Sequence, residues 1–287
     1  MNNKYNIIMF AYNEQSNIEA SITSVYHNVD SRLHTFYILA NGCSDATIPI
    51  AEKTKKNLQF DNLSIIEIEE GDKCNAWNMY MHNIENETDA HFFVDADVNF
   101  TSNSFPLMFD HLMAKDEQTV VIAGMPQSGR NLQFYRSLVK ERACFFGNLY
   151  GMKGSFINRI KEDDFYLPKG LNWIDSFLTK AVNTNLQFFN YNLPNRTTYI
   201  DDVGYYFESL SPFRQSDIKL YFNRIARYEL GKLQETYLDA MSINEWPRDM
   251  GEINQKIAEN IKFHTANLSW FKTLLVKKRL NKLVKRA

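Results

Sequence analysis

Short apolar segments alternate with helical stretches through the first half of the chain, and this alternation limits the fold more than any other feature. Strand patterns are found at residues 5–12, 35–40, 63–68, 90–94 and 119–125, and the continuous apolar run at 90–94 indicates a strand buried on both faces. Between the first two segments, Ile18, Ile22 and Val25 fall at the i, i+4 and i+7 positions of one helix face. The alternation predicts an α/β protein with a doubly wound, mainly parallel sheet.

The second half of the sequence is mainly helical. Over the whole chain, further helical patterns are found at residues 45–58, 73–84, 106–114, 132–150, 174–182 and 214–235. The final segment, residues 252–287, has a helical pattern throughout. We therefore expect the sheet to be followed by a helical C-terminal extension.

The composition supports a substantial core and excludes several classes of protein. The chain has 287 residues, of which 44% are hydrophobic and 14% aromatic, so general disorder is excluded. The formal net charge of −2 hides a split, because residues 272–287 carry seven Lys or Arg and no acid, which leaves −9 on residues 1–271. An acidic body of this kind argues against nucleic acid as a partner.

Cysteine use and hydropathy predict a cytoplasmic protein. Cys43, Cys74 and Cys144 are far apart and form no C-x-x-C motif, which argues for reduced thiols and against disulfides or a structural zinc. The N-terminus shows no signal-peptide pattern, and no apolar run approaches the roughly 18 residues that span a membrane.

Polar residues directly follow four of the predicted strands. They are Asn13 and Glu14, Asn41 and Gly42, Gly71 to Lys73, and Asp95 to Asp97. Because ligands of parallel sheets bind where the carboxyl ends of the strands meet, we expect these residues to gather at one edge. The pair Asp95 and Asp97 could bind a divalent cation, act as acid and base, or cap the next helix.

Six segments in chain order resemble the motifs of one enzyme family. They are MFAYNEQSNI, YILANGCSDAT, GDKCNAWN, FFVDADV, LPKGLNWIDSFL and LYFNRIARYELG. In this order, and placed after the predicted strands, they resemble the motifs of family 2 glycosyltransferases, which have the GT-A fold. The resemblance implies a glycosyltransferase domain at 1–235, made of a nucleotide-sugar-binding half at 1–125 and an acceptor half at 126–235, and a helical extension at 236–287.

The resemblance implies a reaction and its reactants. Family members of this kind move a hexosyl or N-acetylhexosaminyl group from a nucleoside-diphosphate donor, here expected to be a UDP-sugar, to a hydroxyl of a glycan or lipid-linked acceptor. A single displacement inverts the anomeric configuration, and Mg²⁺ or Mn²⁺ stabilises the departing diphosphate. The expected context is glycolipid, lipopolysaccharide or exopolysaccharide assembly.

Roles for individual residues follow from the same resemblance. Asp97, with Asp95, is expected to bind the metal ion, and Asp175 to take the proton from the acceptor hydroxyl as general base. Donor binding is expected from Ala11, Tyr12, Asn13, Glu14, Asn41, Lys73, Asp95, Ala96, Asp97, Arg224 and Arg227. Alternatives stay open, because Asp175 could cap its helix, and Arg224 and Arg227 could form surface ion pairs.

Three positions depart from the family pattern. Ala40 stands where the family usually has an Asp that pairs with the base, so the donor base stays open, with Asn41 or Asp45 as substitutes. Ile174 replaces the usual Glu, and Tyr228 stands where processive members have Trp, which favours a non-processive enzyme.

Two alternative functions stay open. The first is a nucleotide-sugar-binding protein without catalysis. The second is a nucleotidyltransferase, which should carry a Gly-rich phosphate loop after the first strand.

The C-terminal segment has the pattern of a basic amphipathic helix. Its apolar residues share one face and are Val276, Leu280, Leu283, Val284 and Ala287. Lysines and arginines fill the other faces. Residues 268–287 are therefore expected either to lie on the anionic inner face of a membrane or to pack their apolar face on the domain.

Overall fold

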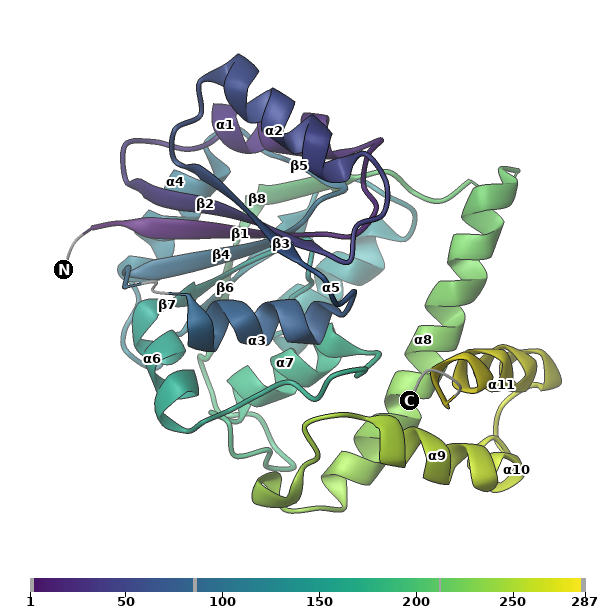
Figure 1. The fold of residues 1–287 in the computed structure, drawn as a ribbon. Helices are drawn as coiled ribbons and strands as arrows, with labels where there is room; N and C mark the ends of the chain where they lie inside the picture. Colours follow the sequence, from purple (N-terminus) through teal and green to yellow (C-terminus); the bar gives the residue numbers. More distant parts are fainter. Residues whose placement is uncertain (1–2, 85–86, 212, 285–287) are drawn as a thin grey trace. The chain divides into compact units, whose positions relative to one another are not determined.

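The computed structural model describes residues 3–84, 87–211 and 213–284 (Figure 1). The chain divides into two compact units. The first consists of Met1–Phe165 and Thr179–Glu208, and the second of Tyr166–Leu178 and Ser209–Ala287. The predicted boundary between 235 and 236 falls inside a helix of the second unit and stays a prediction.

The first unit is built on one mixed sheet. Within the described residues its strands are β1 (Tyr5–Ala11), β2 (Leu33–Asn41), β3 (Leu63–Ile68), β4 (Ala90–Asp95), β5 (Val98–Phe100), β6 (Val121–Pro126), β7 (Leu149–Lys153) and β8 (Thr197–Phe207). They lie in the order β3-β2-β1-β4-β7-β6-β8-β5. Strands β1 to β4 are parallel, β7 is antiparallel to both β4 and β6, and β5 is antiparallel to β8. The predicted mainly parallel α/β sheet is confirmed.

Helices cover both faces of this sheet. They are α1 (Ile18–His27), α2 (Thr47–Leu58), α3 (Lys73–Asn83), α4 (Ser104–Met113), α5 (Leu132–Arg142) and α6 (Gly154–Glu162). Figure 1 shows α1 and α2 on one face, and α3 and α6 on the other. Helix α7 (Ile174–Asn183) begins in the second unit and ends in the first.

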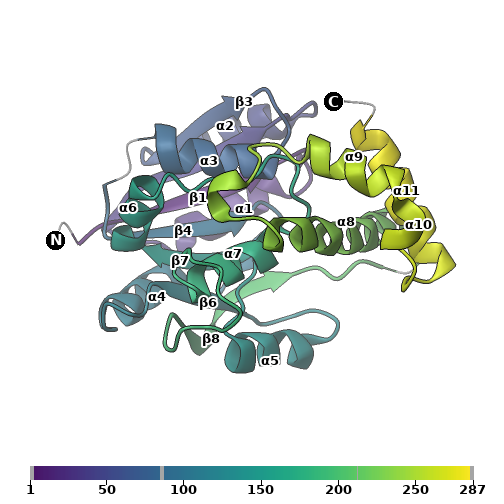
Figure 2. The same cartoon turned by 90° about the horizontal axis from the view of Figure 1, so that it is seen from below.

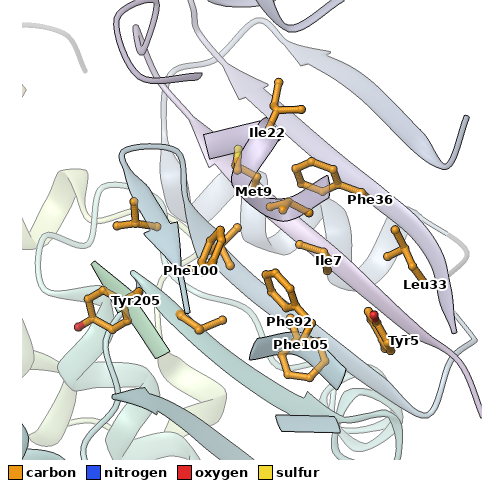
Figure 3. Packing of buried hydrophobic residues seen from close by; sticks show 14 of the residues in the cluster. Tyr5, Ile7, Met9, Ile22, Leu33, Phe36, Phe92, Phe100, Phe105 and Tyr205 are labelled. Atoms are coloured by element: carbon orange, nitrogen blue, oxygen red, sulfur yellow. The ribbon is translucent and has the colours of Figure 1, made fainter. Parts of the chain in front are cut away.

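Strand alternation divides the core of the first unit between the two faces. On the face covered by α1, α2 and α4, Tyr5, Ile7 and Met9 pack with Phe92 and Phe105 in one buried cluster (Figure 3). Their neighbours in sequence point the other way, so Phe93 stacks on Phe10 and Tyr150 and meets Tyr80 of α3. Because side chains alternate, the carboxylate of Asp95 shares the α3 face with Phe93.

The prediction of a helix over residues 132–150 is wrong in its second half. Helix α5 ends at Arg142, Ala143 adopts a left-handed conformation with φ of 51°, and 149–153 form the fully buried strand β7. A Cβ at Gly151 would lie 2.5 Å from a ring atom of Phe92, so this glycine allows β7 to approach the aromatic residues of β4.

The second unit is helical. It contains α8 (Gln215–Asp239), η1 (Ile243–Glu245), α9 (Gly251–Glu259), α10 (Ile261–His264) and α11 (Trp270–Val284). Within the described residues, the predicted helical segment 252–287 consists of α9, α10 and α11, which two turns separate. Figures 1 and 2 show α11 beside α9, and its residues Val276 and Leu280 are buried against α8 and α9. Among the described residues, no helix is long and apolar enough to cross a membrane.

A buried polar cluster joins β1, α3 and β4 in the first unit. His91 is 1% exposed, and its Nδ1 lies 2.8 Å from the hydroxyl of Tyr80, which also accepts a hydrogen bond from Asn6 Nδ2 at 3.3 Å. Burial lowers the pKa of His91 to about 3, and the charge of Lys161 acts in the same direction. Neutral His91 is therefore the form that the folded protein contains.

We expect this cluster to destabilise the fold in mild acid. An unfolded histidine has a pKa of about 6.5, so below that pH the unfolded state takes up a proton that the folded state does not. The titration of His91 therefore leaves the unfolding free energy unchanged above pH 6.5 and lowers it by about 2 kcal/mol at pH 5. Urea denaturation at pH 7.5 and 5 should show this loss, and His91→Gln should reduce the difference. Exposed His34→Gln is the control, and an undiminished difference in His91→Gln contradicts the prediction.

Candidate active site

The loops after β1, β2 and β3 meet at one edge of the sheet. Gly42 has a φ of 69°, and a Cβ there would lie 2.5 Å from the Cα of Gly71, so the two loops touch through their backbones. A Cβ at Gly71 would lie 3.2 Å from the ring of Tyr12, which is 57% exposed. The exposed ring of Tyr12 therefore lies beside the backbone of Gly71, which has no side chain that could cover the ring.

Side chains tie the ends of β1 and β2 together. Asn41 is buried, and its Nδ2 donates to the carbonyl of Ala11 at 3.0 Å. Asn13, with a φ of 56°, accepts a hydrogen bond from the Ser44 amide at 2.8 Å. These contacts give Asn13 and Asn41 a role in shaping the edge, and their expected contacts to a donor stay predictions.

The segment from Asp95 to Asp97 forms the tight turn between β4 and β5. The next element is a strand, and α4 begins later with Asn103 as its N-cap residue. The alternative that the two aspartates cap a helix is therefore wrong. Asp95 is half-buried at the end of β4, Ala96 is buried, and Asp97 is exposed.

Ser21 of α1 holds this turn from beneath. Its hydroxyl is buried and lies 2.9 Å from the carbonyl of Ala96 and 2.8 Å from that of Val98, so its one hydrogen serves both acceptors. Ser21 stands at a core-facing position of α1, where the apolar pattern gives no signal of its role. Sequence reasoning missed it, because its acceptors are 75 and 77 residues away along the chain.

Lys73 connects α3 to the aspartates. Its ammonium group donates to Asp95 Oδ1 at 2.5 Å and lies 5.2 Å from the ring centroid of Phe10. Asp72 fixes the start of α3, because it is the N-cap residue and its carboxylate accepts from the amide of Asn75 at 2.9 Å. The lysine is thus held at the same edge as the carboxylates, as the sequence predicts.

The edge is strongly acidic in spite of Lys73. Burial raises the pKa of Glu14 to about 7, and the charges of Asp97, Asp95 and Asp45 raise it further, against a hydrogen bond from Asn17. Burial is the main cause of this shift, and the three neighbouring carboxylates add to it.

A divalent cation with oxygen ligands fits this acidic edge. Carboxylates are hard ligands of the kind that Mg²⁺ and Mn²⁺ prefer. No set of three or more His, Cys, Asp or Glu side chains that could hold a metal ion occurs in the described part of the chain. The metal role of Asp95 and Asp97 stays a prediction.

The other predicted site residues belong to the second unit. Asp175 is half-buried and is the second residue of α7, so it lies in the first turn but is not the N-cap residue. Arg224 and Arg227 are exposed on α8. Burial lowers the pKa of nearby Arg279 to about 10, and the charge of Arg227 lowers it further.

Residues 6–169 match the sequence profile described as Glycosyl transferase family 2. The chain belongs to this family. The match covers more than half of the chain, including every donor-side residue named above except the two arginines of α8. No curated protein sequence matches the chain significantly.

Several solved structures of sugar-transferring enzymes share the fold at low sequence identity. The mannosyltransferase PcManGT from Pyrobaculum calidifontis, in complex with GDP-Man and Mn²⁺, has 15% identity and a TM-score of 0.62, over 99% of this chain and 74% of that one. TarS from S. aureus in complex with UDP-GlcNAc has 15% identity and a TM-score of 0.55, over 98% and 81%. Glucosyl-3-phosphoglycerate synthase from Mycobacterium tuberculosis, with Mn²⁺ and UDP, has 14% identity and a TM-score of 0.52, over 79% of each.

The family match and the fold together identify a glycosyltransferase with the GT-A fold. The expected GT-A fold and the expected glycosyltransferase activity are confirmed, and the alternative of a nucleotidyltransferase is not supported.

We expect Ser21→Ala to reduce turnover by roughly tenfold or more, because a shift of the β4–β5 turn displaces Asp95 and Asp97. Stability should fall by about 1–3 kcal/mol, since two buried carbonyls lose their donor. Steady-state kinetics and urea denaturation measure the two effects. Thr23→Ala is the matched control on the same helix, because its hydroxyl bonds only to the carbonyl of Glu19. Turnover equal to that of the control contradicts the positioning role of Ser21.

Proposed function

We propose that the protein is an inverting, non-processive, metal-dependent glycosyltransferase. It moves a hexosyl or N-acetylhexosaminyl group from a nucleoside-diphosphate donor to a hydroxyl of a glycan or lipid-linked acceptor. The observation that carries the proposal is the convergence of Tyr12, Glu14, Lys73, Asp95 and Asp97 at the carboxyl edge of the sheet in a chain of this family.

The first unit supports a role in donor binding. Tyr12 offers an exposed ring on which a nucleobase can stack, next to the side-chain-free surface of Gly71. Asp95 and Asp97 would hold Mg²⁺ or Mn²⁺. The ammonium group of Lys73, which donates to Asp95, would also contact diphosphate oxygens. Arg224 and Arg227 remain proposed phosphate contacts. Since solved relatives bind UDP, UDP-GlcNAc or GDP-Man, we propose a UDP-sugar and leave GDP-sugars to the test.

Asp175 is the proposed general base. The acceptor oxygen attacks the anomeric carbon as its proton passes to the carboxylate of Asp175, and the bond from that carbon to the diphosphate oxygen breaks. The electron pair leaves with the nucleoside diphosphate, and the single displacement inverts the configuration. A bound divalent cation supplies positive charge that offsets the charge growing on the departing diphosphate.

We expect nucleoside diphosphates to stabilise the protein in a metal-dependent manner. A ligand at 100 times its Kd adds about 2.7 kcal/mol to the unfolding free energy. Thermal shift against UDP, GDP, ADP and dTDP, each with and without Mn²⁺ or Mg²⁺, identifies the base and the metal. Asp97→Asn should lose the metal-dependent part, whereas exposed Asp61→Asn should retain it. A full shift in Asp97→Asn contradicts the metal assignment.

We expect Asp175→Asn to lower kcat by roughly 10²- to 10⁴-fold while leaving nucleotide binding intact. The amide retains the size of the side chain but cannot accept the proton. Turnover is measured as nucleoside diphosphate released from UDP-glucose, UDP-GlcNAc or GDP-mannose. This variant also separates the enzyme from the alternative of a binding protein, for which wild type and variant would both release none.

We also propose that α11 docks the enzyme on an anionic membrane surface, in keeping with glycolipid, lipopolysaccharide or exopolysaccharide assembly. The face expected to do so is not available, because Val276 and Leu280 pack inside the second unit. Residues Lys285, Arg286 and Ala287 lie outside the described residues. The exposed side of α11 instead carries Trp270 and Leu274, one turn apart and 79% and 55% exposed.

Lysines accompany these two exposed side chains. Lys278 and Lys282 are exposed on α11, and Lys277 is half-exposed. Tryptophan prefers the headgroup level of a bilayer, and each lysine near an anionic surface contributes about 1 kcal/mol.

We expect the protein to co-sediment with phosphatidylglycerol vesicles at low salt and not with phosphatidylcholine vesicles. Trp270→Ala with Leu274→Ser should weaken this binding roughly tenfold or more through lost apolar burial. Leu107→Ser is the control, because that leucine is 45% exposed on α4 of the first unit. Binding that is absent at low salt, or unchanged in the double variant, contradicts the docking proposal.

A further inference from the structure

The loop that leads into α7 is fixed at its first residue by main-chain hydrogen bonds within the second unit. The amide of Lys169 donates to the carbonyl of Arg248 at 2.9 Å, and the amide of Met250 donates to the carbonyl of Lys169 at 2.9 Å. These two bonds form an isolated parallel bridge between the loop and the segment just before α9. The loop ends at Trp173, two residues before Asp175.

Gln234 of α8 fixes the middle of the same loop. Its side chain is fully buried, and its Oε1 accepts from the backbone amide of Asn172 at 2.9 Å and from Asn172 Nδ2 at 3.1 Å. Its Nε2 donates to the carbonyl of Gly170 at 3.2 Å and to Asn254 Oδ1 of α9 at 2.8 Å. Both lone pairs and both hydrogens of the amide are thus used, which also fixes its orientation.

Arg279 of α11 completes the arrangement from a third helix. Its Nε donates to Asn172 Oδ1 at 2.5 Å, while Asn172 Nδ2 also donates to the carbonyl of Gly170 at 2.9 Å. Asn172 is therefore held through its backbone amide and through both polar atoms of its side chain. Burial lowers the pKa of Arg279 to about 10, which still leaves the guanidinium charged at neutral pH, so the bond is charge-assisted.

Close packing fixes the end of the loop. A Cβ at Gly231 of α8 would lie 2.4 Å from the Cβ of Trp173, so α8 contacts the loop there without an intervening side chain. The Trp173 ring packs on Tyr228 at 4.4 Å between centroids. A hydrogen-bonded network and a close backbone contact therefore determine the chain path up to the residue before α7.

We infer that Gln234, Asn172 and Arg279 are positioning residues for Asp175, so that three helices of the second unit set the orientation of the general base. A fully satisfied buried amide network specifies one geometry, whereas apolar packing alone would allow the loop several. The inference rests on the proposed function of Asp175. It gives the helical extension a part in the acceptor reaction that its sequence pattern does not suggest.

The first test is Gln234→Leu, which retains most of the volume and removes all four hydrogen bonds. We expect kcat for nucleoside diphosphate release from the most active donor of the panel to fall roughly 10- to 100-fold. The thermal shift given by the corresponding nucleoside diphosphate with Mn²⁺ should be unchanged, because the donor-side residues of the first unit are intact. Gln255→Leu is the matched control, since Gln255 is exposed on α9 and bonds only to Glu259. A folded Gln234→Leu variant with wild-type kcat overturns the inference.

The second test is a double-mutant cycle that separates positioning from general loss of structure. Gln234→Leu in the background of Asp175→Asn should reduce the residual turnover less than threefold, because the base that it positions is already absent. An equal loss in both backgrounds overturns the inference. Arg279→Met removes a single hydrogen bond and gives the same comparison should Gln234→Leu not fold. Wild-type turnover in Asp175→Asn instead refutes the base assignment itself, whatever the Gln234 variants show.

Discussion

Parallel pairing of β1 with both β2 and β4 determines where the polar residues of the carboxyl edge lie. Ala11 is level with Ala40, and Phe10 is level with Asp95, so the three strands end together. A shift of β4 by one residue would turn Asp95 away from α3. It would also move the side chains of Phe93 and His91 to the opposite face of the sheet. The aromatic contacts on both faces of β4 exclude such a shift, and the position of the aspartates is thus a consequence of core packing.

The gathering of polar residues at the carboxyl edge of the sheet was predictable because its signals are local. Short apolar-rich segments alternating with helical patterns identified β1 to β4, and the polar residues after them needed only the rule that parallel strands end at one edge. Strands β5, β7 and β8 were missed for a physical reason. They are short or alternate with polar residues, and their place in the sheet depends on partner strands that are distant in the sequence. The segment after α5 has apolar residues that suit a helix, but its glycine at 151 is required by Phe92 across the sheet.

Residues that act through tertiary contacts were beyond sequence reasoning. Ser21 and Gln234 each stand in a helix where a polar residue on the inner face has no local explanation. Their partners come from elements tens of residues away, so only the folded chain shows which carbonyls and amides they satisfy. The same holds for Val276 and Leu280, whose apolar stripe predicts a buried face without indicating whether protein or lipid buries it.

The second unit is discontinuous in sequence, and this has a consequence for how such a chain can be divided. Its segment of residues 166–178, the loop and the start of α7, comes from the middle of the chain, while the helices that hold the loop come from the end. A single cut, at 208 or at 235, would separate the loop from Gln234 or from Arg279. The helical extension is therefore not a module that recombination could add to or remove from the sheet unit by one crossover. It has to be inherited together with the segment that carries Asp175.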